Sequence, residues 1–234
     1  MTKLTKEERA RYSRMISLPE MGEEALIRLK QSRVLIIGAG GLGSVTIPSL
    51  AAAGAGHIGI VEFDKVEESN LQRQLLYTPS DIGKEKIHIA KAKAEQLNPN
   101  LEISIYKEQF NQTNSKDLVS AFDLILDCTD NLPTRFLIND TCAKLKKPLI
   151  YASVSDYKGM VTILHHQKNM NLRDIFPEAP EKAESAGIIP TLPMIIGSIQ
   201  ANEAIKLLTR AGDILDGQLL IYNILKNSFH VVNL

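Results

Sequence analysis

The amino-acid sequence predicts an α/β fold with a doubly wound, mainly parallel sheet and antiparallel strands toward the C-terminus. Apolar runs of strand length alternate with helical patterns from residue 33 to residue 210, and a glycine-rich turn joins the first strand to the next helix. Parallel strands need long crossover connections, which helices usually supply. Two further strand patterns, 218–223 and 228–232, follow each other without a helix and predict a closing hairpin.

The expected helices start and stop at recognisable signals. Thr5 and Glu8 have the spacing of a capping box, which marks the start of the first helix. Gly54 ends the helix after the glycine turn, and Pro48 inside that helix predicts a kink or a shortening. The expected helices are residues 5–16, 44–53, 86–97, 131–145 and 191–210, with a short one ending near residue 121.

The expected strands are short apolar or alternating runs between turn residues. They are residues 34–37, 58–63, 101–106, 122–127, 148–154, 160–165, 218–223 and 228–232. Residues 169–187, rich in Glu, Ala and Pro, form the longest irregular stretch. A loop of this length inside a compact domain is usually functional or mobile.

Composition narrows the class of protein. Hydrophobic residues make up 44% and charged residues 23% of the 234, as in soluble globular proteins. The 27 Lys and Arg balance the 27 Asp and Glu, so no basic excess points to nucleic acid as a partner. Two cysteines are too few for a disulfide framework, and the charged N-terminus lacks a signal-peptide core. We therefore expect a cytoplasmic protein without a membrane span.

The turn after the first strand has the spacing G-x-G-x-x-G, formed by Gly38, Gly40 and Gly43. A strand, a glycine turn and a helix in this order point backbone N–H groups and the positive helix end at a phosphate. One glycine permits the tight turn, one lets phosphate approach the backbone, and one lets helix and strand pack closely. The motif predicts a Rossmann-like nucleotide site, and nicotinamide-dependent dehydrogenases share it.

Polar residues follow two further strands. Glu62 ends the second strand, where dinucleotide-binding folds place an acid that accepts the ribose hydroxyls. The segment 64–74 after it is polar and irregular, and residues 127–131 follow the buried run 122–127. Because open α/β sheets bind ligands at the carboxyl ends of their strands, these segments are candidates for the site.

Four motifs coincide in one order: GAGGLG at 38–43, SNLQRQ at 69–74, G-x-x-K at 83–86 and DCTDN at 127–131. With them, the chain from Arg11 to its end resembles the ubiquitin-activating-like adenylyltransferases of the ThiF, MoeB and HesA type. The resemblance implies ATP-dependent adenylation of a small ubiquitin-like sulfur-carrier protein ending in Gly-Gly, for thiamine or molybdopterin-type cofactor biosynthesis. The carrier's terminal carboxylate attacks the α-phosphate of Mg-ATP, and pyrophosphate leaves.

The resemblance also implies roles for individual residues. Arg73 and Lys86 match cations that bind phosphate, Asp130 matches the acid that works with Mg²⁺, and Glu62 stands where the family usually has Asp at the ribose. Arg14 matches an arginine that family members supply across a homodimer interface. The implied catalytic residues are thus Arg14, Arg73, Lys86 and Asp130. The implied nucleotide contacts are Gly38, Gly40, Gly41, Gly43, Glu62, Asp64, Ser69, Asn70, Leu71, Gln72, Arg73, Lys86, Asp130 and Asn131.

The chain departs from its relatives at two places. Relatives often bind zinc through two C-x-x-C pairs, but the first pair would fall at Asn171 and Asp174, so we expect no zinc site. Relatives also often carry a cysteine near the position of Ala183, which is used in a thioester or persulfide step. Cys128 and Cys142 are poor substitutes, since buried thiols are usually inert. A separate sulfur donor is therefore expected.

Other functions stay open at this stage. A dehydrogenase would share the glycine turn, but Arg73 and Lys86 suit a triphosphate and no hydride-transfer site is evident. A relative that has lost catalysis, or one that adenylates a peptide or a tRNA base, is also compatible. We expect one adenylation domain over residues 1–234, with its nucleotide-binding part at about 33–150 and its carrier-binding and dimer part at about 151–234.

Overall fold

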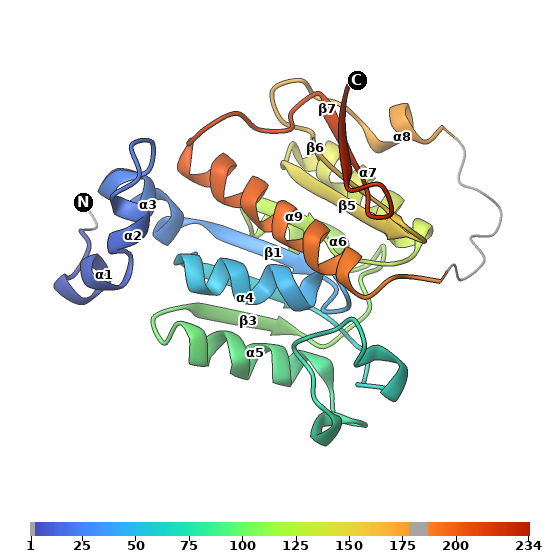
Figure 1. Ribbon diagram of the computed structural model, residues 1–234, viewed down its shortest axis with the longest axis horizontal. Coiled ribbons are helices and arrows are strands. Elements are labelled where there is room, and N and C mark those ends of the chain that lie inside the picture. Colours follow the sequence, from blue (N-terminus) through green and yellow to red (C-terminus); the bar gives the residue numbers. More distant parts are fainter. Residues whose placement is uncertain (1–2, 178–186) are drawn as a thin grey trace.

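The computed structural model describes residues 3–177 and 187–234, which form an eight-stranded sheet with helices on both faces (Figure 1). The strand order is β3-β2-β1-β4-β5-β6-β7-β8. The first five in this order pair in parallel, and β6, β7 and β8 continue the sheet in antiparallel pairing. The strands are β1 (Arg33–Ile37), β2 (His57–Val61), β3 (Glu102–Tyr106), β4 (Leu124–Asp127), β5 (Leu149–Ser155), β6 (Lys158–Leu164), β7 (Gln218–Asn223) and β8 (Ser228–Asn233).

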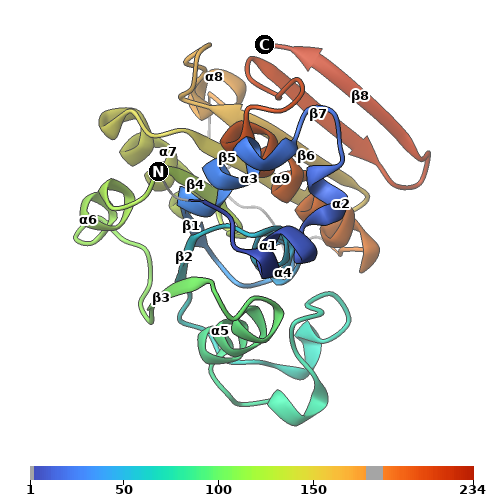
Figure 2. The same cartoon turned by 90° about the vertical axis from the view of Figure 1, so that its left-hand side faces the viewer.

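The predicted fold class is confirmed, because the mainly parallel sheet ends in an antiparallel hairpin as expected. Figure 2 shows β7 and β8 at one edge of the sheet and β3 at the other. The helices of ten or more residues are α3 (Gly22–Gln31), α4 (Gly43–Ala53), α5 (Lys86–Leu97), α7 (Leu132–Leu145) and α9 (Thr191–Thr209), and α6 (Ser115–Ser120) has six. Shorter turns are α1 (Lys6–Arg11), α2 (Ser13–Ile16), η1 (Glu68–Asn70), η2 (Pro79–Asp81) and α8 (Leu172–Ile175).

Alternation along the central strand divides the core into two layers. Val34 and Ile36 of β1 pack with the helices α4, α5 and α9 on one face, whereas Leu35 and Ile37 face the helices α6 and α7 (Figure 1). All four side chains are buried, as is typical of a parallel strand covered on both sides. The sheet therefore has no solvated face at its centre, and ligands have access only at strand ends and loops.

The N-terminal helix departs from the prediction. The expected helix 5–16 is broken at Tyr12 into α1 and α2, although the Thr5–Glu8 capping box is present. Tyr12 is buried, and its ring lies 2.8 Å from the point where a Cβ on Gly54 would stand. Its hydroxyl also accepts a hydrogen bond from Asn98 (3.3 Å). These contacts from distant parts of the chain interrupt the helix, and they are not visible in the local pattern.

Three further differences concern helices. The helix α3 was not expected from the sequence, and it begins at Gly22 (φ +61°) without a side-chain cap. Pro48 does not shorten α4, which runs from Gly43 through Ala53, and the alternative expectation of a kink stays a prediction. Part of the stretch 169–187, expected to be irregular, forms the single turn α8. Within the described residues, no helix is long and apolar enough to cross a membrane.

Candidate active site

Three strand ends meet at the centre of the sheet and carry three of the segments singled out in the sequence. The strand order reverses between β1 and β4, the point at which open α/β sheets bind ligands. The amide of Gly38 donates to Val61 at the end of β2 (2.9 Å), and the amide of Cys128 donates to Ile37 (2.9 Å). The glycine turn, the acid after β2 and the turn after β4 are therefore neighbours.

The glycine turn needs glycine for reasons of space. Gly38 has φ +98°, and a Cβ on it would lie 2.7 Å from the Cys128 carbonyl oxygen. A Cβ on Gly43 would lie 2.2 Å from the carbonyl oxygen of Gly38. A Cβ on Gly40 would meet only the Gln74 amide nitrogen, at 3.7 Å. The first and last glycines close the turn, whereas the surface over the middle one stays accessible to a ligand.

The peptide groups of Ala39, in the middle of this turn, are held from both sides. Its amide donates to Glu62 Oε2 (2.8 Å), and its carbonyl accepts a hydrogen bond from the Tyr77 hydroxyl (2.7 Å). Tyr77 is buried, and burial together with the nearby Glu62 carboxylate raises the pKa of its hydroxyl. The phenol therefore stays a donor across the physiological range. Sequence reasoning missed Tyr77, because the contact spans 38 positions.

The Glu62 carboxylate organises its own strand end as well as the turn. Its Oε1 accepts hydrogen bonds from the amides of Phe63 (2.7 Å) and Asp64 (2.8 Å), in addition to the Ala39 contact at Oε2. Three backbone donors thus fix the side chain, which is buried. Glutamate is one methylene longer than the Asp that is usual in relatives at this position, and this length is compatible with the three backbone contacts. Its predicted contact with ribose hydroxyls stays a prediction.

The predicted phosphate-binding cations lie on the loop after β2 and at the start of α5. Lys86 is buried, and its Nζ lies 3.3 Å from the Asp64 carboxylate. Arg73 is half-buried, and one guanidinium nitrogen donates to the Ser69 carbonyl (2.9 Å). Lys86 is thus paired with an acid at this side of the site, whereas Arg73 contacts a backbone carbonyl.

The other predicted contacts on this loop have different environments. Asn70 is buried, and its side-chain oxygen accepts a hydrogen bond from the Glu67 amide (3.3 Å), so it shapes the turn η1. Leu71 packs against the core, whereas Gln72 is exposed. The Gln74 side chain is also buried, and its Oε1 has no hydrogen-bond partner among the described residues. An unpaired buried acceptor beside the glycine turn is a feature that a bound ligand or water would satisfy.

The turn after β4 contains the predicted metal-binding acid. Asp130 is exposed, and no hydrogen bond or ion pair joins its carboxylate to another side chain in residues 3–177 and 187–234. Asn131 caps α7, since its side-chain oxygen accepts a hydrogen bond from the Thr134 amide (3.0 Å). Asp127, just before the turn, is fully buried, and burial raises the pKa of its carboxyl. Arg135 lies beside it. Asp127 belongs to the DCTDN motif, whereas sequence reasoning missed Arg135.

Arg14 lies away from these groups within one chain. It is exposed on α2, two positions after Tyr12, and Tyr12 packs on Gly54 at the C-terminal end of α4. The glycine turn lies at the other end of α4, whose 11 residues span about 16 Å. Figure 1 likewise shows α1 and α2 on the side where β1 begins. Arg14 therefore does not join the site of its own chain.

The two thiols are buried. Burial raises the pKa of both Cys128 and Cys142 well above the ordinary thiol value. The Cys128 thiol donates to the Gln200 side-chain oxygen (3.2 Å), and the Gln200 amide nitrogen donates to the carbonyls of Asp127 (2.8 Å) and Ile150 (3.1 Å). The predicted loop position Ala183 and its neighbour Ser185 lie outside the described residues.

The two residues that stand where relatives carry the first zinc-binding pair have structural contacts here. The Asn171 side chain accepts a hydrogen bond from the Arg173 amide (2.9 Å), and Asp174 accepts one from the Asn171 amide (3.0 Å). Together they cap the short helix α8.

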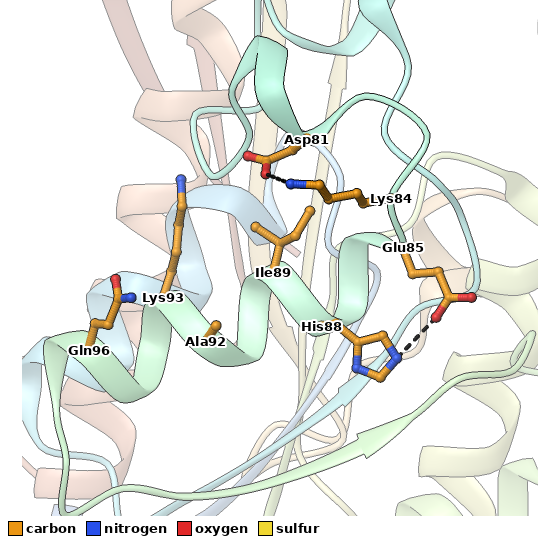
Figure 3. Close-up of a pocket in the computed structure, with 8 residues that line it drawn as sticks. All are labelled: Asp81, Lys84, Glu85, His88, Ile89, Ala92, Lys93 and Gln96. Atoms are coloured by element: carbon orange, nitrogen blue, oxygen red, sulfur yellow. Dashed lines mark hydrogen bonds and ion pairs between the residues drawn. The ribbon is translucent and has the colours of Figure 1, made fainter.

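A hollow of about 480 Å³ lies on the outer face of α5 and the loop before it (Figure 3). Four of its side chains already form two pairs, Lys84 with Asp81 (3.3 Å) and His88 with Glu85 (3.0 Å). None of the predicted site residues lines this hollow. The candidate active site is instead the set of loops at the carboxyl ends of β1, β2 and β4.

The strand order, the reversal between β1 and β4 and the glycine turn at that point define the class of α/β proteins that bind nucleotides in the Rossmann manner. Within this class, a sequence model of the ThiF family matches residues 12–234. The chain belongs to the ThiF family, as the four motifs predicted.

Named relatives agree with this assignment. The chain is 39% identical to a sulfur carrier protein adenylyltransferase of Thermus thermophilus, over 96% of this chain and 87% of the relative. It is 40% identical to the adenylyltransferase and sulfurtransferase MOCS3 of Drosophila sechellia, over 95% of this chain but only 50% of that relative. It is also 40% identical to a probable molybdopterin-synthase adenylyltransferase of Porphyra purpurea, of which it spans 60%. The predicted enzyme class, an adenylyltransferase of the ThiF and MoeB type, is confirmed.

Solved structures support the fold. The crystal structure of PaaA superposes with a TM-score of 0.83 at 24% identity, over all of this chain and 75% of that one. E. coli MccB with MccA-N7isoASN gives a TM-score of 0.81 at 20% identity, over 96% of this chain and 71% of that one. At these identities the likeness concerns the fold alone.

Proposed function

We propose that this chain adenylates the C-terminal glycine of a small ubiquitin-like sulfur-carrier protein, for thiamine or molybdopterin-type cofactor biosynthesis. One observation carries the proposal: the glycine turn, the buried Lys86 at the start of α5 and the Asp130 carboxylate, which is unpaired among the described residues, all lie at the carboxyl ends of the strands. This edge offers amide donors, positive charge and a free carboxylate, which together suit a metal-bound triphosphate.

The reaction brings two anions together, the carrier carboxylate and the α-phosphate of ATP. The carboxylate oxygen forms a bond to phosphorus, and the bond to the leaving pyrophosphate breaks. Negative charge develops on the phosphate and pyrophosphate oxygens, and fixed positive groups stabilise it. We assign this role to Arg73, Lys86 and the amides of Gly40 and Gly41. We assign the ribose hydroxyls to Glu62, which already orders the turn, because dinucleotide-binding folds place an acid at this strand end.

Magnesium fits the donor set of this site. Asp130 offers an exposed carboxylate without a protein partner among the described residues, and Mg²⁺ is usually held by one or two carboxylates together with substrate phosphates. When bound, the ion neutralises charge on the phosphate oxygens and orients the triphosphate. Asp130 holds the ion from the protein side, and Lys86 and Arg73 bind phosphate oxygens from the other loops.

The reaction also needs Arg14, which we propose acts from the partner subunit of a homodimer. Arg14 lies at the amino end of the sheet, about one α4 length from the glycine turn of its own chain. Mixing inactive Arg14→Ala subunits with inactive Asp130→Ala subunits should restore activity, because one of the two hybrid sites has both groups. Absence of recovery, with subunit exchange demonstrated by mass spectrometry, would show that Arg14 does not act in trans.

The decisive assay is carrier-dependent exchange of labelled pyrophosphate into ATP. Arg73→Ala and Asp130→Ala should each lower the exchange rate on the order of 10²–10³-fold, as loss of one fixed charge in such a site does. The exposed Asp213 and Arg9, which lie elsewhere, provide the matched controls Asp213→Ala and Arg9→Ala. Exchange within a few-fold of wild type in Arg73→Ala and Asp130→Ala would refute the assigned roles.

The second half of sulfur activation is assigned to a separate sulfur donor. The two thiols of the chain are buried, with pKa values raised by burial, and no cysteine occurs in residues 169–187. With carrier and Mg-ATP, we expect the carrier to gain AMP and both thiols to stay unmodified by mass spectrometry. A reductant-sensitive adduct that disappears in Cys128→Ser or Cys142→Ser would overturn this. We also expect the protein to fold and to catalyse exchange when elemental analysis shows that it contains no zinc.

A further inference from the structure

The turn that carries Asp130 is held by side chains on the three residues before it. The Thr129 amide and hydroxyl both donate to Asp127 Oδ1, at 2.9 Å and 2.7 Å. The Gln200 amide nitrogen donates to the Asp127 carbonyl, and the Cys128 thiol donates to Gln200. Among the described residues, Asp130 alone in this run has an unpaired side chain. Its carboxylate is thus free while its backbone neighbours are fixed.

Arg135 provides the last of these contacts. It lies on α7, and one guanidinium nitrogen donates to the Thr129 carbonyl, directly before Asp130, at 2.7 Å. The guanidinium carbon lies 5.6 Å from the centre of the Tyr151 ring, and a second nitrogen donates to the Tyr151 hydroxyl (3.4 Å). Arg135 is 9% exposed, so its charge is turned toward the protein interior. It does not reach outward to substrate as Asp130 does.

Two buried polar atoms in this cluster have no partner in the described chain, Asp127 Oδ2 and Arg135 Nε. Burying polar groups without partners costs stability, and the contacts with Thr129 and Tyr151 leave one hydrogen-bonding atom of each residue unpaired among the described residues. The cluster therefore lowers the stability of the fold. The contacts of this cluster orient the Thr129–Asp130 peptide, which offsets that cost with a role in the site.

We propose that Arg135 is a positioning residue that directs the Asp130 carboxylate toward the metal-bound nucleotide. It acts through the Thr129 carbonyl, with Asp127 holding the same residue from the other side. A guanidinium suits this role better than an ammonium, because its planar fork donates to a carbonyl while its face lies over an aromatic ring. The inference rests on the proposed function only in taking Mg-ATP as the ligand of Asp130.

The test measures ATP binding by calorimetry as a function of Mg²⁺ concentration, without any carrier protein. Groups that orient a metal-binding side chain typically change metal affinity about 10–100-fold when removed. Arg135→Met should raise the half-saturating Mg²⁺ concentration by about tenfold or more in the wild-type background, and by less than about twofold in the Asp130→Asn background. Arg173→Met is the matched control, since Arg173 also lies over an aromatic ring, 4.6 Å from the centre of Phe136, but on α8. It should leave the Mg²⁺ dependence unchanged.

Equal effects of Arg135→Met in both backgrounds, or an unchanged Mg²⁺ dependence, would overturn the proposal. If Arg135→Met fails to fold, Arg135→Lys keeps the charge and the stem, and the same comparison is made with it. Failure of the proposed function is separable from failure of this inference. A protein whose Mg-ATP binding depends on Asp130 and, through it, on Arg135, but which shows no exchange with any carrier, would refute the function and leave the positioning role intact.

Discussion

Tyr77→Phe is the sharpest test of how the glycine turn is held. Phenylalanine fills the same space, so the substitution removes one hydroxyl and leaves no large cavity. The Ala39 carbonyl then loses the hydrogen bond that it accepts at 2.7 Å, in a place where water has little access. The Ala39 amide keeps its bond to Glu62. The variant therefore removes one of the two hydrogen bonds that hold the backbone of Ala39 and leaves the other in place.

The magnitude follows from that single contact. An unmade hydrogen bond in a buried site costs about 1.5 kcal/mol of unfolding free energy. For a chain of 234 residues this corresponds to a drop in Tm of roughly 3–6 °C. If the full amount, about 1.5 kcal/mol, is also lost from the free energy of ATP binding, KM for ATP rises by about tenfold at most. Burial raises the pKa of Tyr77, so these effects should not change between pH 6 and 9.

The assays are thermal denaturation and pyrophosphate exchange at varied ATP. Tyr157→Phe is the matched control, because Tyr157 is 48% exposed and lies in the turn between β5 and β6. It should match wild type in both Tm and KM. A Tyr77→Phe protein with unchanged Tm and unchanged KM would show that the Tyr77 hydroxyl does not hold the turn.

Three further predictions concern charge, pH and thiol reactivity. Lys86→Met should lower pyrophosphate exchange on the order of 10²–10³-fold, whereas Lys84→Met, which removes a surface cation paired with Asp81, should stay within about twofold of wild type. The hydrogen bond from Arg173 holds the pKa of Asp140 below its ordinary value. Asp140 therefore stabilises the fold above about pH 4, and this contribution is lost as the pH falls further. In urea titrations, the destabilisation caused by Asp140→Asn should shrink from pH 7 to pH 3. Iodoacetamide at pH 8 should label neither Cys128 nor Cys142 in the native protein and both after unfolding, and rapid native labelling by mass spectrometry would contradict their burial.

Local patterns predicted most of the fold. The glycine turn, the strand 34–37 before it and the hairpin 218–232 all depend on neighbouring residues, and the structure has them within a residue or two. The missed helix α3 has buried Ala25, Leu26 and Leu29 at helical spacing, but its N-terminus has no side-chain cap to signal the start. The break at Tyr12 depends on Gly54 and Asn98, which no local pattern reveals.

The candidate site was predictable where a motif marks it. Glycines and polar runs after apolar strands located the turn, Glu62 and Asp130, because strand ends in a parallel sheet converge. The motifs do not show which side chains fix these groups. Tyr77 contacts Ala39 across 38 positions, and Gln200 contacts Asp127 across 73. Such contacts follow from the packing of whole elements. Arg14 lies apart from the site of its own chain, as expected for an arginine that the resemblance implies is supplied across a dimer interface, and its role stays a prediction.

The helix α9 has a consequence for how this chain acquires its structure. It packs on α4 and on β5, and its Gln200 occupies the donors and acceptors of groups on β4 and β5. Asp127 and Cys128 therefore lack this partner until about two hundred residues have been made, and closing loops of 73 and 72 positions slows folding. A fragment ending at residue 150 should stay partly unfolded, with its amides exchanging rapidly in deuterated water. We therefore expect the nucleotide loops and the C-terminal helix to fold together in one cooperative step, and not as two units that fold independently.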